Sequence, residues 1–218
     1  MIPLYHDFTE ESVLVFGGGA VGARKARRFA AEAEVTVVAP AFEFGADDYG
    51  GAELVEASPT PAEVADWVAR YSPALVVAAT DDEAVNDAAE RAAREAGALV
   101  NRADVSGERE GAGSVVVPAT AEDGDVRVAI STGGASPALS KHLRERIEAE
   151  IEGAGAMAEL TGRLREEMRE SDRTPRERRD AVRAVVRSER VWKALRTGES
   201  KARQEADRVI RNTGGGER

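Results

Sequence analysis

The stretch that decides the fold is Ser12-Val13-Leu14-Val15-Phe16-Gly17-Gly18-Gly19-Ala20-Val21-Gly22. It opens with a short apolar run that stops at a glycine, a pattern typical of a strand buried on both faces. Residues 20–33 follow with many good helix formers, and their arginines and lysine fall mostly on the outer side of the predicted helix. The junction therefore predicts a buried strand that turns directly into a helix.

The glycines of this junction fit the spacing G-x-G-x-x-G, which binds a dinucleotide when it joins a strand to a helix. Gly17 permits the tight turn, Gly19 lets a pyrophosphate approach the backbone, and Gly22 allows the helix to pack closely on the strand. The helix N-terminus offers free N–H groups to the phosphates. The alternative is a glycine-rich turn that binds nothing.

Strands and helices continue to alternate along the first half of the chain. Strands are predicted at 35–39, 53–56, 74–79 and from 99, and helices at 61–70 and 82–96. This alternation predicts an α/β fold with a doubly wound parallel sheet.

The alternation stops near residue 113. Two short strands are predicted at 114–117 and 126–130, separated by a turn at 121–125, and Ser136 with Pro137 predicts the start of a helix that runs to about 152. The chain then reads as helical, with a break at 171–175 and a frayed end at 214–216. These changes predict three parts: a dinucleotide-binding domain over 1–113, a small region over 114–152 and a charged helical tail over 153–218.

Composition excludes several classes of protein. The chain has 218 residues and no cysteine, so it has no thiolate nucleophile, disulfide or iron–sulfur cluster of its own. Its net charge of −10 argues against a nucleic-acid partner. We expect a cytoplasmic protein, because no apolar stretch is long enough to span a membrane and the start lacks signal-peptide features. The two histidines have no partner at metal-binding spacing, so no metal site is predicted.

Charge is unevenly distributed. Residues 1–160 carry a net charge of −16, whereas residues 161–218 carry +6. The basic tail is either a surface that attracts an anionic ligand or an ordinary solvated helical face.

The second strand ends without the acidic residue that holds the ribose in many NAD domains. Ala39, Pro40, Ala41 and Phe42 stand there, and Glu43 comes slightly late. No lysine or arginine occurs between Arg28 and Arg70 to receive the extra phosphate of NADP, so NAD is the favoured cofactor.

Polar residues follow the next two strands at the edge where doubly wound sheets bind ligands. Thr80 and Asp81 follow one strand and are candidate cofactor contacts, with capping of the next helix by Thr80 or Asp81 as the alternative. Asn101 and Asp104 follow the other strand. Asp104 is a candidate general base beside a nicotinamide, or else a solvated loop acid.

A second unusual string is Ser131-Thr132-Gly133-Gly134-Ala135-Ser136-Pro137. Small hydroxyl residues and glycines ahead of a helix N-terminus are typical of a site for an anionic group such as a substrate carboxylate. The alternative is a flexible turn between domains.

Taken in order, these strings resemble the precorrin-2 dehydrogenase and sirohydrochlorin ferrochelatase family, the amino-terminal module of siroheme synthase. The resemblance covers residues 1–150, and it rests on the glycine motif with Arg24-Lys25, on 36–40, on 78–86, on Asn101 with Asp104 and on 131–137. The tail matches only in character.

The resemblance implies NAD-dependent oxidation of precorrin-2 to sirohydrochlorin, and some members of the family also insert ferrous iron as a substrate. It also implies a homodimer and a catalytic role for Asp104. Cofactor contacts are implied at Ala20, Val21, Pro40 and Ala41, and substrate contacts at Ser131, Thr132 and Ser136.

One reading from a different class stays open. An NAD-sensing regulatory module with a partner-binding helical tail also explains the glycine motif and the charged tail, although it leaves Asn101, Asp104 and the string at 131–137 unexplained.

Overall fold

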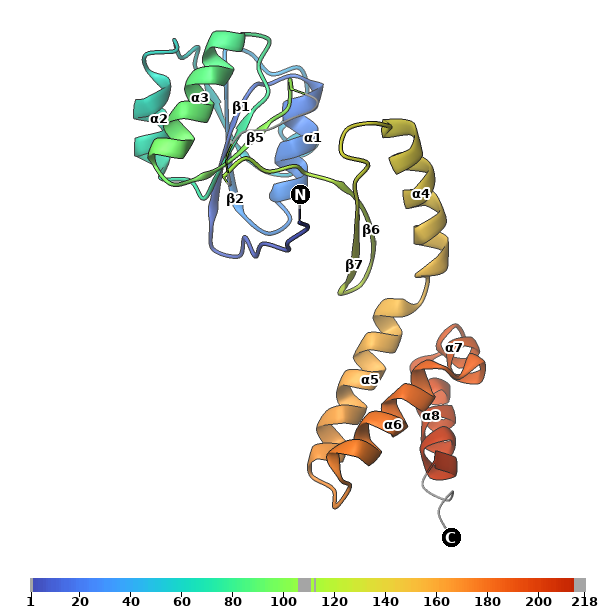
Figure 1. The fold of residues 1–218 in the computed structure, drawn as a ribbon. Helices are drawn as coiled ribbons and strands as arrows, with labels where there is room; N and C mark the ends of the chain where they lie inside the picture. The colour runs from blue at the N-terminus through green and yellow to red at the C-terminus, as the bar shows by residue number, and fades with distance from the viewer. Residues whose placement is uncertain (1, 106–110, 112, 214–218) are drawn as a thin grey trace. The chain divides into compact units, whose positions relative to one another are not determined.

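The structure is a computed structural model that describes residues 2–105, 111 and 113–213. Five parallel strands form one sheet in the order β3-β2-β1-β4-β5 (Figure 1). The strands are β1 (Ser12–Phe16), β2 (Glu34–Ala39), β3 (Glu53–Glu56), β4 (Leu75–Ala78) and β5 (Leu99–Arg102). The chain adds β2 and β3 on one side of β1, and then adds β4 and β5 on its other side. This arrangement confirms the doubly wound α/β fold predicted from the alternation.

Helices cover both faces of the sheet because neighbouring strand residues point to opposite sides. Leu14 and Phe16 pack against α2 (Val64–Tyr71) and α3 (Glu83–Glu95), whereas Val13 and Val15 pack on the side of α1 (Ala20–Phe29). A 3-10 turn, η1 (Ala46–Tyr49), adds a fully buried tyrosine to the second layer. Two buried faces explain why the strands read as continuous apolar runs.

A two-stranded antiparallel sheet follows, made of β6 (Ala119–Asp123) and β7 (Val126–Ile130). The prediction for β7 is confirmed, but the strand expected at 114–117 is wrong. Only an isolated bridge joins Ser114 to Val100, and the hairpin partner of β7 lies further along the chain. Asp123 pairs with Val126, so the turn is shorter than the predicted 121–125 and is placed by Gly124 with a φ of 57°.

The helix after the hairpin begins where the sequence predicts. Ser136 caps α4 (Pro137–Glu150) by accepting a hydrogen bond from the Leu139 N–H at 3.3 Å. None of the residues of α4 is buried.

Four further helices form the tail, as its composition predicts: α5 (Ala154–Arg169), α6 (Pro175–Val186), α7 (Glu189–Leu195) and α8 (Glu199–Thr213). The predicted break falls between α5 and α6, where Thr174 and Glu177 form a capping box. The tail has its own apolar core, whose buried residues come from all four helices: Met157, Leu160, Leu164, Met168, Ala181, Val185, Val191, Ala194, Ala202, Ala206 and Ile210. It is therefore a packed helical body.

The chain divides into two compact units. One comprises residues 1–117 and 133–135, and the other comprises residues 118–132 and 136–218. The three-part division of the chain stays a prediction. Among the helices of the described residues, none is both long and apolar enough to cross a membrane.

Candidate functional site

The turn between β1 and α1 can be built only from glycine at two positions. Gly17 has a φ of +123°, and a Cβ there would lie 2.3 Å from the Ala79 carbonyl oxygen. A Cβ on Gly22 would lie 1.9 Å from the Gly17 carbonyl oxygen. These contacts agree with the turn and packing roles that the motif predicts for the two residues.

Gly18 adds a constraint that motif spacing does not reveal. A Cβ on Gly18 would lie 2.3 Å from the Ala41 carbonyl oxygen, so the turn packs against the segment that follows β2. The buried Tyr49 hydroxyl donates a hydrogen bond to the Gly18 carbonyl and fixes the turn from the other side. The middle glycine is thus needed for packing within the domain.

Gly19, by contrast, faces open space. It is exposed and stands at the N-cap of α1, where it has no side chain that could cap the helix. The nearest atom to a Cβ at Gly19 is Glu43 Oε2, at 3.7 Å. The N-terminus of α1 is therefore accessible to a ligand at this point.

A carboxylate of the chain lies at this helix N-terminus. The Ala20 N–H donates a hydrogen bond of 3.1 Å to Glu43 Oε2, which shows that this N–H can bind an anion. Glu43 is exposed, so its carboxylate can be displaced by a phosphate. Val21, Pro40 and Ala41 are also exposed and lie around the same edge. The residues fit the pyrophosphate of a dinucleotide.

Thr80 and Asp81 follow β4 at the carboxyl edge of the sheet. Thr80 is tied to the buried Asn86, whose Oδ1 accepts hydrogen bonds from the Thr80 N–H (3.1 Å) and hydroxyl (2.8 Å). The expectation that Thr80 or Asp81 caps α3 is wrong. Asp82 caps the helix, because its carboxylate accepts from the N–H groups of Ala84 and Val85. Asp81 stays exposed and is available to a ligand.

The prediction that Asn101 follows the strand is wrong, because β5 continues to Arg102 and Asn101 lies within it, only 2% exposed. Its Nδ2 donates a 2.7 Å hydrogen bond to the Val115 carbonyl, which holds the segment after residue 113 against the sheet. Its Oδ1 is buried and has no hydrogen-bond partner in the described part of the chain. Asn101 therefore positions backbone, and it retains one acceptor for a further group.

Asp104 belongs to a charged network that is centred on Arg102. The Arg102 guanidinium is 7% exposed and binds Asp104 through both carboxylate oxygens, at 2.9 and 2.7 Å. It also donates to Asp87 at 2.7 Å and to Glu90 at 2.9 Å. Such a fork holds the Asp104 carboxylate in one orientation. Sequence reasoning missed Arg102, although a lone arginine at the end of a buried strand indicates carboxylate partners nearby.

The network sets the charge state of Asp104. Hydrogen bonding to Arg102 holds the pKa of the Asp104 carboxyl below its usual range, and a smaller contribution comes from the Asn86 side chain. Partial burial acts in the opposite direction and is outweighed. The same contact raises the pKa of Arg102 further above its usual range. Asp104 is consequently an ionised, oriented carboxylate at neutral pH.

Ser131, Thr132 and Ser136 belong to the second unit. The Thr132 hydroxyl donates to the Ser136 carbonyl at 3.2 Å and accepts from the Ser136 N–H at 3.2 Å. Because Ser136 caps α4, both residues shape the turn, whereas Ser131 is exposed. Gly133 and Gly134, with φ of 63° and 85°, complete the turn.

No three His, Cys, Asp or Glu side chains within residues 2–105, 111 and 113–213 lie close enough to hold a metal ion together.

Two family models match the chain. Residues 4–119 match a family described as putative NAD(P)-binding, and residues 123–150 match a family described as sirohaem biosynthesis protein central. Together they cover the sheet domain and the region of β7 and α4.

Relatives match along most of the chain. A precorrin-2 dehydrogenase of Methanosarcina barkeri is 32% identical over 214 residues, which is 96% of this chain and 93% of the relative. Siroheme synthases of Pseudomonas paraeruginosa and Aeromonas salmonicida are 36% and 33% identical, but the chain spans only 35% and 44% of their lengths. The solved structure of SirC, a precorrin-2 dehydrogenase, shares the fold with a TM-score of 0.69 at 24% identity and covers 97% of this chain and 100% of its own. The chain belongs to the family of precorrin-2 dehydrogenases and of the corresponding region of siroheme synthases.

Proposed function

We propose that this protein oxidises precorrin-2 to sirohydrochlorin with NAD as the hydride acceptor. The observation that carries the proposal is the pairing, at one edge of the sheet, of an open glycine turn with an oriented carboxylate. Gly19 and the Ala20 N–H stand after β1, and Asp104 stands after β5. Family membership supplies the substrate, because a precorrin-2 dehydrogenase matches the chain over nearly its whole length.

The glycine turn and its surroundings would hold the cofactor. Gly19, Ala20 and Val21 would present backbone to the pyrophosphate at the N-terminus of α1, on the turn that Gly17 and Gly22 make possible. The exposed backbone of Pro40 and Ala41 would border the ribose, and Thr80 and Asp81 would border the cofactor beside β4. When bound, NAD accepts a hydride from carbon.

NAD is favoured over NADP by charge. The segment after β2 carries the Glu43 carboxylate and has no basic residue to meet an additional phosphate, since the next arginine is Arg70. A carboxylate beside the ribose edge repels a phosphate and accepts hydrogen bonds from hydroxyls.

Asp104 contributes a fixed negative charge. Loss of a hydride leaves positive charge on the tetrapyrrole, and an oriented carboxylate stabilises that charge as it develops. The tetrapyrrole then releases one proton to give sirohydrochlorin. The lowered pKa of Asp104 makes its carboxylate a weak proton acceptor, which favours this electrostatic role over general-base catalysis. Arg102 keeps the Asp104 carboxylate ionised and holds it in one orientation. We assign substrate contacts to Ser131, Thr132 and Ser136, whose hydroxyl groups suit the carboxylates of the substrate. We also assign one to Asn101, whose remaining acceptor suits a hydrogen-bond donor of the substrate.

A homodimer completes the proposal. Helix α4 buries none of its residues, and Leu139 is 47% exposed on it. A second copy packing on α4 would remove this apolar surface from water.

The test is an anaerobic assay of purified protein with precorrin-2 and NAD, following NADH absorbance together with the tetrapyrrole spectrum. NADH formed in step with sirohydrochlorin supports the dehydrogenase. NAD binding without NADH formation refutes it and favours the NAD-sensing regulatory module. A second run with ferrous ion, compared with a protein-free control, separates a simple dehydrogenase from one that also inserts iron.

A further inference from the structure

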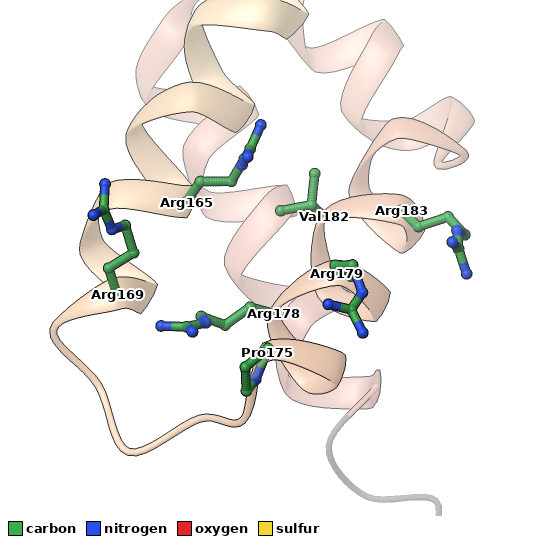
Figure 2. Close-up of a pocket in the computed structure, with 7 residues that line it drawn as sticks. All are labelled: Arg165, Arg169, Pro175, Arg178, Arg179, Val182 and Arg183. Atoms are coloured by element: carbon green, nitrogen blue, oxygen red, sulfur yellow. The ribbon is translucent and has the colours of Figure 1, made fainter.

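A groove lined mainly by arginine lies between α5 and α6. Its volume is about 630 Å³, and its lining residues are Arg165, Arg169, Pro175, Arg178, Arg179, Val182 and Arg183 (Figure 2). This size lies within the range of roughly 300–1,000 Å³ that small-molecule sites occupy. Figure 2 shows Arg165 extending from α5 toward α6 and Arg178 extending from α6 toward α5.

Most of these arginines have no acidic partner. Arg183 forms an ion pair with Asp180 at 3.4 Å. Arg165, Arg169, Arg178 and Arg179 make no side-chain hydrogen bond or ion pair with any residue of the described part of the chain. Some arginines elsewhere in the tail are paired, as Arg163 is with Glu199 and Arg203 with Glu167. The groove therefore concentrates unneutralised positive charge.

The groove also offers some apolar surface, from the half-buried Val182 and from Pro175. Arg178 is partly exposed, and the other arginines of the groove are exposed. Bringing several guanidinium groups together creates a repulsion between them that a bound anion relieves. In a chain with a net charge of −10, a groove of this kind selects a compact anion with an apolar body.

We propose that the α5–α6 groove is a binding site for a polycarboxylate tetrapyrrole, formed by other residues than those of the cofactor edge of the sheet. This inference rests on the proposed function, because the protein that handles such a molecule has a reason to hold it. Arginine forks match carboxylates geometrically, and Val182 and Pro175 suit the apolar face of a macrocycle. A long nucleic acid fits less well, because the net charge of −10 on the whole chain opposes a polyanion that extends beyond the groove.

The experiment uses the full chain and uroporphyrin, a stable octacarboxylic porphyrin, in titration calorimetry at low salt without NAD. The test variant is Arg165→Gln with Arg178→Gln. The matched control is Arg190→Gln with Arg211→Gln, which removes the same charge from exposed arginines of α7 and α8 that do not line the groove. Circular dichroism and urea unfolding check that both variants keep the helical core.

We expect the groove variant to lose one class of porphyrin sites or to bind porphyrin about tenfold more weakly. Each substitution removes an exposed ion pair between an arginine and a porphyrin carboxylate. The control should stay within about twofold of the unaltered protein, and affinity should fall with added salt. Equal weakening of both variants would show charge attraction without a site and would overturn the proposal. Tighter binding of inorganic triphosphate or of a short RNA, lost in the same variant, would overturn it in favour of a phosphate site.

The outcome is independent of the dehydrogenase assay. Porphyrin binding is measured without NAD or turnover, and the groove residues are remote in sequence from Asp104 and the glycine turn. A protein that oxidises precorrin-2 but shows no groove-dependent binding refutes only this inference. A protein that binds uroporphyrin through the groove but forms no NADH refutes only the proposed reaction.

Discussion

Replacing Arg102 by methionine removes the cation that holds the network around Asp104. Methionine keeps an unbranched apolar stem, so the change deletes the guanidinium with little change in packing. Three carboxylates then lose their common partner: Asp104, Glu90 and Asp87, with side chains 27%, 20% and 50% exposed. Breaking a fully buried ion pair costs about 3–5 kcal/mol, and the partial exposure of these carboxylates reduces the expected loss to about 2–3 kcal/mol. For a domain of this size that corresponds to a melting temperature lower by roughly 10 °C.

The effect depends on pH with a definite sign. The pKa of Asp104 is lower in the folded protein than its usual value of 3.8, so Asp104 contributes stability above that pH and loses it as pH falls through the lowered pKa. The gap in unfolding free energy between the wild-type protein and Arg102→Met should therefore be full at pH 7 and should shrink on acidification below about pH 4. In activity, the variant should move the acid limb of the pH profile to higher pH, because Asp104 then regains or exceeds its ordinary pKa.

Urea unfolding at pH 7, 5 and 3.5 measures the gap, and Arg94→Met is the control. Arg94 forms an ion pair with the same Glu90, but as an exposed pair one helical turn apart, 40% and 20% exposed. Its loss should cost no more than about 0.5 kcal/mol. The reasoning is refuted if the two variants are equally stable at pH 7, or if the Arg102→Met gap widens as pH falls.

Further predictions concern the glycine turn, the carboxylate and α4. Gly22→Ala should destabilise the first unit by about 3 kcal/mol in urea unfolding, because its Cβ would lie 1.9 Å from a carbonyl oxygen. Gly19→Ala, whose Cβ would meet only Glu43 Oε2 at 3.7 Å, should fold normally yet lose NAD affinity in calorimetry; normal affinity would contradict pyrophosphate binding there. Asp104→Asn should lower the rate of NADH formation about a hundredfold with NAD affinity unchanged, and unaltered turnover would remove Asp104 from the chemistry. Leu139→Lys should weaken the proposed homodimer in sedimentation equilibrium, whereas a monomeric wild-type protein would exclude that dimer.

The apolar runs were enough to predict the sheet. Val13 to Phe16 and Leu75 to Ala78 are buried on both faces, so no polar residue is tolerated within them and the strands stand out in the sequence. The hairpin was harder to predict. Residues 126–130 alternate between more and less buried positions and were predicted, but residues 119–123 do not alternate, so hydrophobicity could not fix where β6 begins.

The candidate site also has features that the sequence predicts and features that it does not. Glycine spacing predicts the turn because backbone conformation is local, and Gly17 at a φ of +123° is such a local requirement. The contact of Gly18 with Ala41, and the position of Glu43 at the N-terminus of α1, depend on where the segment after β2 crosses the turn. Sequence spacing alone carries no information about that crossing.

By itself, the sequence determined the α/β class, the glycine turn, the helical tail and the family, because each depends on local conformation or on the order of short strings along the chain. Only the tertiary structure decided that Arg102 in β5 forms ion pairs with Asp104 and with Asp87 and Glu90 of α3. It also decided that unpaired arginines of α5 and α6 line one groove. Both depend on charges that are distant in sequence and become neighbours only after helices pack. Electrostatic interaction depends on that final distance and on burial, and neither is set by position in the chain.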